Sequence, residues 1–547
     1  MSPTQRNHRA SASDAKWRAM GLPARPGIAA IGTQVQIGAV RSPERAALEI
    51  FGGAVRTYSQ LHERTNRLAQ ALLGYGLAPG SRVGIWLTNC LEYMDIYLAC
   101  AKAGLVVVQI NIRHKGSEAR YQLENSDCAA FFYGSTVASY VEELGVAGDL
   151  QLLVGVDCEL IKHAVEFEGF LASGANIMPP EPNDDDLLVI GYTSGTTGFP
   201  KGAELTHRSV KTLGQTNAIT NRYVVGSTQV FGLSLSFSAG IPAHVLPHMF
   251  VGGTTVLLRD WNTESLIDAV ESRRATFTIL PSPPIMEFCA LVERDVRRVG
   301  SLVSLLHSSS KAPPEHLESL VGAIGSRLVE GWGMTENSGG LIAATVASDY
   351  QPPREGIYNS TGRAAPDAVI RLVDEDGNLL PHDNDAVGQL VAHSASLARG
   401  YWRNPEASRE TFRDGWYYSG DLGRIDPDGY VSIIDRRPDL IVSGGMNVYP
   451  SEVERVILTF PGVRECSVVA DSHPRWGQTP VAFVSLDDPS ITVESILAFC
   501  NHEIATYKAP TKIVIIDELP RNVSGKVLRR ELRTMLGQHV DGSASTR

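Results

Sequence analysis

The 547-residue sequence predicts an α/β protein. We expect a large N-terminal domain of parallel-rich sheets with helices, a small β subdomain, and a small C-terminal α/β domain. Short apolar runs such as residues 105–108 alternate with amphipathic helical patterns, which is typical of parallel sheets covered on both faces. Prolines and glycines interrupt this pattern over residues 350–361, and a second, shorter α/β pattern ends the chain.

Residues 1–26 are predicted to form a disordered tail. Their basic residues stand against a single acid, Asp14, which is the composition of a transit peptide, but the amphipathic pattern of such a peptide is poor. We therefore expect a tail and a cytoplasmic protein.

Hydrophobic periodicity and turn residues predict the elements that follow. Residues 58–75 place Leu61, Leu68 and Leu72 at helical spacing, and Gly76 ends the helix. The same reasoning predicts a helix over 92–104 and strands over 83–87, 105–108, 187–190, 256–258, 277–280, 302–307 and 327–330.

The second half of the chain has a different pattern. Short strands separated by turns predict a small all-β unit over residues 369–391. From about residue 438 to 536 the pattern predicts helices over 451–458 and 493–504 and strands over 463–469, 481–485 and 512–516.

Composition excludes several classes of function. The net charge of -11 argues against a nucleic-acid-binding protein, because phosphate contacts need clustered Lys and Arg. No apolar run approaches ~18 residues, so we expect no transmembrane helix. The seven cysteines include no Cys-x-x-Cys pair, which predicts reduced thiols instead of a zinc site or a disulfide framework.

Residues 193–202, Thr-Ser-Gly-Thr-Thr-Gly-Phe-Pro-Lys-Gly, have the composition of a phosphate-binding loop. An apolar strand precedes them, and Thr206 can cap a following helix, so we expect a strand, a loop and a helix. Small residues let backbone N–H groups turn towards an anion, and Lys201 adds a positive charge. The spacing is not that of a Walker loop, because Pro200 and Gly202 flank the lysine.

This loop resembles the signature loop of the adenylate-forming superfamily, which includes acyl-CoA synthetases, luciferases and adenylation domains of peptide synthetases. The resemblance extends over residues 40–535, with five motifs in the family's order. It implies that the loop binds the phosphates of ATP. The residues so assigned are Thr193, Ser194, Gly195, Thr196, Thr197, Gly198 and Lys201.

Three further motifs resemble nucleotide-binding segments of that superfamily. In residues 331–336, Gly-Trp-Gly-Met-Thr-Glu, the resemblance implies that Trp332 borders the base, Thr335 contacts the α-phosphate and Glu336 holds Mg²⁺. A carboxylate suits this hard cation. Asp421 is implied to accept hydrogen bonds from the ribose hydroxyls, and Arg436 to contact ribose or phosphate.

The C-terminal motifs imply a mobile domain. By resemblance, Lys526 contacts the carboxylate and the α-phosphate during adenylation, whereas Gly444, Gly445 and Gly333 border the acyl or CoA site. The domain then swings between two half-reactions, adenylation of an acid and transfer to a thiol. The resemblance also divides the chain into an AMP-binding domain, residues 27–436, and a C-terminal domain, residues 437–547.

Three positions depart from the family pattern. Pro438 stands where relatives commonly have a lysine or aspartate as the hinge, and proline fixes φ, so we expect a displaced or stiff hinge. Phe237 replaces the usual histidine at the acyl site. Ser310 lies in a serine-rich stretch that replaces a glycine-rich one. The substrate of a relative therefore cannot be assigned to this protein from the resemblance.

We expect an acyl-CoA synthetase that uses ATP, Mg²⁺ and CoA on a fatty or other hydrophobic carboxylic acid. The motifs leave two alternatives open: an acyl-AMP ligase that delivers to a carrier protein, and a catalytically inactive nucleotide-binding regulator. They do not decide whether the protein is a homodimer, nor which acid it takes.

Overall fold

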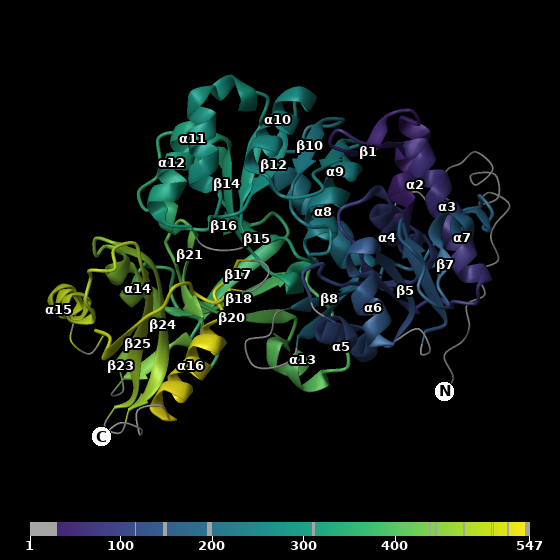
Figure 1. Cartoon of the computed structure of the whole chain (residues 1–547). Helices are drawn as coiled ribbons and strands as arrows, with labels where there is room; N and C mark the ends of the chain where they lie inside the picture. Colours follow the sequence, from purple (N-terminus) through teal and green to yellow (C-terminus); the bar gives the residue numbers. More distant parts are fainter. Residues whose placement is uncertain are drawn as a thin grey trace.

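The computed structural model describes residues 30–114, 116–145, 150–193, 200–308, 312–436, 439–443, 446–473, 476–504, 506, 508–521 and 525–541. Within them a large N-terminal domain of sheets and helices is followed by a small C-terminal domain, as predicted. Figure 1 shows α14, α15, α16, β24 and β25 as a lobe beside β17, β18 and β20.

The first large sheet has seven strands in the order β7-β6-β5-β3-β4-β8-β9. Only β9 is antiparallel to its neighbour, and the other pairings are parallel. Its strands are β3 (Arg82–Trp86), β4 (Val106–Gln109), β5 (Cys128–Gly134), β6 (Leu152–Val156), β7 (Val165–Glu166), β8 (Leu187–Thr193) and β9 (Lys201–Thr206). The accompanying helices are α3 (Tyr58–Gly74), α4 (Leu91–Ala103), α5 (Gly116–Ser126), α6 (Ala138–Leu144), α7 (Phe167–Ala172) and α8 (His207–Thr220).

The second sheet has nine strands in the order β16-β15-β14-β13-β12-β10-β11-β1-β2. Strands β10 to β14 and β1 pair in parallel, and β2, β15 and β16 add antiparallel edges. The strands are β1 (Ala46–Ile50), β2 (Val55–Thr57), β10 (Thr228–Phe231), β11 (Thr254–Leu257), β12 (Phe277–Leu280), β13 (Ser304–His307), β14 (Leu328–Gly333), β15 (Leu341–Ala344) and β16 (Arg363–Ala364). The helices are α2 (Ile31–Arg41), α9 (Leu246–Phe250), α10 (Thr263–Arg273), α11 (Ile285–Arg294) and α12 (Pro314–Ile324).

Buried polar side chains join these two sheets. The Asn89 amide, just after β3, donates to the carbonyl oxygens of Leu233 and Leu258, both at 2.8 Å. Gln109, at the end of β4, donates to the carbonyl of Leu235 at 2.6 Å. Because these bonds join the ends of strands from both sheets, they bring loops of the two sheets together.

The smaller sheets complete the molecule. The β subdomain contains β17 (Ala368–Val373), β18 (Gly388–Ser394), β19 (Phe412–Arg413), β20 (Trp416–Ile425), β21 (Val431–Arg436) and α13 (Pro405–Thr411). The C-terminal domain contains β22 (Ile441–Ser443), β23 (Met446–Val448), β24 (Val463–His473), β25 (Gly477–Leu486), β26 (Lys512–Ile515), α14 (Pro450–Leu458), α15 (Val493–Glu503) and α16 (Arg529–Asp541). Asp435, at the end of β21, accepts from the Ser451 amide at 3.0 Å and pairs with Arg529 at 3.4 Å, which attaches α14 and α16 to the β subdomain.

One local prediction is wrong. The loop after β8 does not lead directly into a helix, because residues 201–206 form β9 and pair antiparallel with β8. Ala203 and Leu205 are buried, whereas Lys201 and Glu204 are half-buried, and this alternation is the pattern of a strand. Helix α8 starts one residue after β9, with Thr206 as its cap accepting from the Ser209 amide, as predicted.

Three buried histidines predict acid sensitivity. Burial lowers the pKa of His207, His244 and His248 from the ordinary 6.5 to about 4. Between these values the unfolded chain binds protons that the folded chain does not, so the free energy of unfolding falls as the pH drops from 6.5 towards 4. We expect a thermal midpoint several degrees lower at pH 5 than at pH 7, measured by calorimetry. His207→Gln should reduce this difference, and an unchanged difference would contradict the contribution of His207.

Candidate active site

The ends of the predicted phosphate loop lie side by side. Thr193 and Lys201, which flank the loop, are paired residues of β8 and β9. Residues Ser194, Gly195, Thr196, Thr197 and Gly198 lie outside the described residues. The backbone of residues 399–402 runs along β9, because the amides of Glu204 and Trp402 donate to the carbonyls of Gly400 and Gly202 at 2.9 and 2.7 Å.

Tyr401 joins the loop lysine to the predicted metal ligand. The ammonium nitrogen of Lys201 lies 5.3 Å from the centroid of the Tyr401 ring. The Tyr401 hydroxyl donates to Glu336 Oε1 at 2.6 Å. Glu336 is 9% exposed, and its carbonyl accepts from the Ala398 amide at 2.7 Å. The lysine and the carboxylate, predicted separately, therefore contact the same ring.

The predicted base and ribose contacts also meet. Trp332 Nε1 donates to Asp421 Oδ2 at 2.9 Å, and both residues are about 5% exposed. Asp421 pairs across the sheet with Arg436, of which the structure describes only the backbone. Because Trp332 is the penultimate residue of β14 and Asp421 lies on β20, this contact joins the second sheet to the β subdomain.

Thr335 lies between the nucleotide segment and the predicted acyl segment. Its hydroxyl is 3.0 Å from Ser238 Oγ. Phe237, beside Ser238, is half-buried, and its carbonyl accepts from Gln109 at 3.3 Å. Gly333 admits no side chain, since a Cβ there would lie 2.5 Å from the carbonyl oxygen of Gly340. The predicted acyl residue and the predicted α-phosphate contact are thus neighbours.

The C-terminal predictions are less completely placed. Lys526 is exposed, and a Cβ on the preceding Gly525 would lie 4.0 Å from Pro283 Cγ, so this loop approaches the second sheet. The described contacts do not bring Lys526 to Thr335. The other predicted positions, Ser310, Pro438, Gly444 and Gly445, lie outside the described residues.

Glu336 is the predicted ligand of Mg²⁺. Across the described ranges, no cluster of three or more His, Cys, Asp or Glu side chains could hold an ion. Among the described residues, Glu336 would therefore supply a single protein carboxylate to the ion. This fits Mg²⁺, which commonly binds through one or two carboxylates together with substrate phosphates and water.

Comparison with known proteins decides the family. The model of the AMP-binding enzyme family matches residues 35–402, and that of the AMP-binding enzyme C-terminal domain matches residues 452–526. This chain belongs to the AMP-binding enzyme family. The predicted resemblance to adenylate-forming enzymes is confirmed.

Relatives of this AMP-binding enzyme are named CoA ligases. A feruloyl-CoA synthase from Amycolatopsis is 32% identical, and the match covers 91% of this chain and 97% of the relative. A long-chain-fatty-acid–CoA ligase from Mycobacterium tuberculosis is 30% identical, over 87% and 92%. The structure of ATP-bound MatB from Rhodopseudomonas palustris is 25% identical, with a TM-score of 0.83, over 93% and 99%. The predicted enzyme class, acid–thiol ligase, is confirmed by the named relatives.

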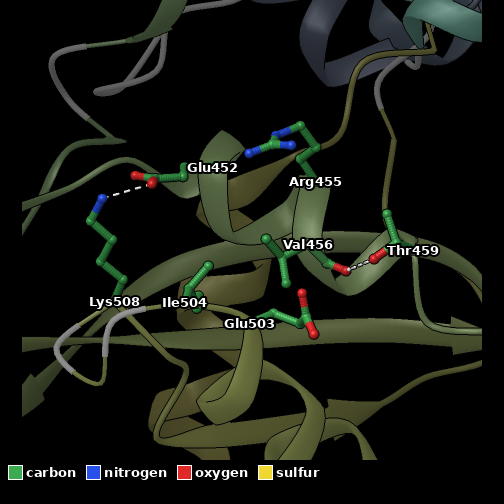
Figure 2. A pocket seen from close by; sticks show the side chains of 7 residues that line it. All are labelled: Glu452, Arg455, Val456, Thr459, Glu503, Ile504 and Lys508. Atoms are coloured by element: carbon green, nitrogen blue, oxygen red, sulfur yellow. Dashed lines mark hydrogen bonds and ion pairs between the residues drawn. The ribbon is translucent and has the colours of Figure 1, made fainter.

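Two hollows of about 430 Å³ lie among the described residues, one in the C-terminal domain and one beside Tyr401, which contacts Lys201 and Glu336. Figure 2 shows the one in the C-terminal domain, where Glu452 and Lys508 form an ion pair of 2.6 Å at its rim. The other lies beside Tyr401 and is lined by Arg399 and Arg403, which pair with Glu204 and Asp127. Since carboxylates offset these cations, neither hollow is assigned a ligand.

The sequence did not reveal two polar side chains of this AMP-binding enzyme. Tyr401 lies 65 positions from Glu336, and Ser238 lies 97 positions from Thr335, so neither pairing has a local signal. Ser238 lies in the segment that departs from the family pattern at Phe237, but a serine at this position carries no sequence signal of its own. No helix in the described part of the chain is long and apolar enough to cross a membrane.

Tyr401→Phe tests the contact with Glu336. The change keeps the ring beside Lys201 but removes the only hydroxyl it carries, and a hydrogen bond to a charged group contributes about 1.5–3 kcal/mol. We expect ATP-dependent adenylation to slow by about tenfold or more, measured by pyrophosphate release. Tyr140→Phe, at an exposed position of α6, is the matched control. Equal adenylation rates for Tyr401→Phe and Tyr140→Phe would contradict a role of the Tyr401 hydroxyl in adenylation.

Proposed function

We propose that this AMP-binding enzyme activates a carboxylic acid with ATP and transfers the acyl group to CoA. The observation that carries this proposal is that Lys201 and Glu336 both contact Tyr401, while Trp332 and Asp421 form a separate hydrogen-bonded pair. The named relatives, which are CoA ligases, support the choice of acceptor.

In the first half-reaction the carboxylate of the acid attacks the α-phosphorus of ATP, and pyrophosphate leaves. Trp332 and Asp421 bind the nucleoside, while the loop ending in Lys201 binds the phosphates. When bound, Mg²⁺ neutralises negative charge on the phosphates. Glu336 would hold this ion, and the hydrogen bond from the Tyr401 hydroxyl orients that carboxylate. Thr335 and Lys526 donate to the oxygens on which charge develops.

In the second half-reaction the CoA thiol attacks the acyl carbonyl, and AMP leaves. The C-terminal domain, residues 437–547, moves relative to residues 27–436, so that the Lys526 loop withdraws and residues 444–445 approach Gly333. Gly333 is exposed at the end of β14, so its backbone is accessible to an approaching ligand. The fixed φ of Pro438 is expected to displace or stiffen this hinge.

The acid is a fatty or other hydrophobic one. Half-buried Phe237 lies beside the Ser238–Thr335 contact, where it offers an apolar ring close to the reacting centre. Aromatic and long-chain acids among the named substrates of relatives agree with an apolar pocket.

Mass spectrometry tests the function. Reactions contain ATP, Mg²⁺ and one acid from an aliphatic, aromatic or alicyclic panel, each with and without CoA. We expect one acid to give AMP and its CoA thioester when CoA is present. An acyl adenylate that accumulates whether or not CoA is added would favour a ligase that serves a carrier protein. ATP binding with no product from any acid would favour a nucleotide-binding regulator.

A further inference from the structure

Ser282, His307 and Glu330 form a hydrogen-bonded chain. His307 Nδ1 pairs with the Glu330 carboxylate, and His307 Nε2 lies 2.9 Å from Ser282 Oγ. The His307 side chain is fully buried, Glu330 is 5% exposed and Ser282 is half-buried. Since a carboxylate only accepts, Nδ1 carries the proton, and Nε2 accepts from the Ser282 hydroxyl.

These three hydrogen-bonded side chains lie at the carboxyl ends of three neighbouring parallel strands. His307 ends β13 and pairs in register with Leu280 of β12 and with Glu330 of β14. Ser282 follows β12 by two residues, and Trp332 follows Glu330 by two residues on β14. Ligands of open parallel sheets bind beyond the carboxyl ends of the strands. Ser282 therefore stands on the edge of the sheet that also carries Trp332.

A serine with a histidine and a carboxylate resembles a hydrolase triad, but the local backbone argues against that activity. A hydrolase needs backbone N–H groups next to the nucleophile to stabilise an oxyanion. Pro283 and Pro284 follow Ser282, and proline has no N–H. The Ile285 amide already donates to the Ser282 carbonyl at 3.2 Å. The Ser282–His307–Glu330 arrangement can transfer a proton. It lacks the neighbouring N–H donors that would stabilise the oxyanion formed on the way to an acyl-enzyme.

The proposed reaction requires one proton transfer. Adenylation transfers none, because the acid attacks as its carboxylate. Thioester formation releases one, since the thiol must lose its proton while sulfur bonds to the acyl carbon and the bond from that carbon to AMP breaks.

We propose that Ser282 is a catalytic residue of the second half-reaction and takes the proton of the CoA thiol. As that proton reaches Ser282 Oγ, the serine's own proton passes to His307 Nε2, and Glu330 stabilises the resulting imidazolium. His307 and Glu330 are positioning residues that act through Ser282. The imidazolium later returns its proton to water. This inference rests on the proposed function.

The position of the Lys526 loop fits this order of events. Gly525 approaches Pro283, the residue after Ser282. In this arrangement the Lys526 loop, which is assigned to adenylation, lies next to the Ser282 end of the hydrogen-bonded Ser282–His307–Glu330 chain. Its withdrawal before the second half-reaction would clear the approach to Ser282 when the thiol arrives.

Other titratable groups near the Ser282–His307–Glu330 chain lie on segments next to β14. The amide of Glu330 donates to Thr345 Oγ1 at 2.8 Å, and Tyr350 donates to the same hydroxyl at 3.1 Å. Burial raises the pKa of Tyr350, so it stays neutral in the assay range. Asp349 accepts from Tyr430 at 2.6 Å. Among these described neighbours, His307 and Glu330 are the pair that can exchange a proton with Ser282.

The experiment measures the two half-reactions separately on the full chain. Pyrophosphate release reports adenylation. Mixing preformed acyl adenylate with CoA in a single turnover reports thioester formation. Ser282→Ala and His307→Gln should leave adenylation within about threefold and slow thioester formation by roughly 10²-fold, the usual contribution of proton transfer. Ser282→Thr should restore much of the rate because it keeps a hydroxyl. Ser272→Ala, on the exposed face of α10, is the control.

A solvent isotope effect separates proton transfer from a structural role. Thioester formation by the unaltered enzyme should be slower in D₂O than in H₂O, and Ser282→Ala should lose that difference. Equal slowing of both half-reactions, or thioester formation unchanged by Ser282→Ala, would overturn the proposal. If the unaltered enzyme makes adenylate but no CoA thioester, the proposed function fails instead.

Discussion

Lys526→Ala is expected to slow acyl adenylate formation by about 10²–10³-fold, the cost of removing one donor from a developing anion. The proposed role places the Lys526 ammonium beside the α-phosphate and the attacking carboxylate only in the first half-reaction. The second half-reaction, started from preformed adenylate, should therefore stay within about threefold of the unaltered rate. Pyrophosphate release and single-turnover thioester formation measure the two rates.

Lys512→Ala is the matched control for this prediction. Lys512 is an exposed lysine of β26 in the same domain, so it reports any general effect of removing a positive charge. Equal losses in the two half-reactions for Lys526→Ala would contradict a role confined to adenylation. They would also argue against the proposed withdrawal of its loop.

Glu336→Gln is expected to reduce adenylation by about 10²-fold or more, since it removes the one carboxylate proposed to hold Mg²⁺. The amide keeps the size of the side chain and can still accept from Tyr401. The loss should therefore reflect the charge and not the packing. Raising the Mg²⁺ concentration should recover part of the rate, because weaker binding is offset by mass action.

Titration of the adenylation rate with Mg²⁺ measures this effect. Glu318→Gln, on the exposed face of α12, is the control because it removes one negative charge at a surface position outside the predicted site. A Glu336→Gln rate that stays low at every Mg²⁺ concentration would point to a role of Glu336 other than metal binding. A Glu336→Gln rate equal to that of the unaltered enzyme would contradict any role of the Glu336 carboxylate in adenylation.

Local sequence determined most of the secondary structure. The predicted helix over residues 58–75 is α3 (Tyr58–Gly74), and the apolar run over 105–108 is β4 (Val106–Gln109). Thr206 caps α8 as expected. These features depend on side-chain periodicity and on residues a few positions apart, which a sequence displays directly. The family was equally apparent, because its motifs are contiguous.

Only the tertiary structure decided which of these residues meet. It turned residues 201–206 into β9, because that segment pairs with β8. It joined Trp332 to Asp421, 89 positions apart, and Ser282 to His307, 25 positions apart. Such contacts depend on how parallel strands order themselves in a sheet, and side-chain periodicity along one strand carries no information about its neighbours. The sequence thus determined the reaction class, and the fold supplied Tyr401 and the Ser282–His307–Glu330 chain.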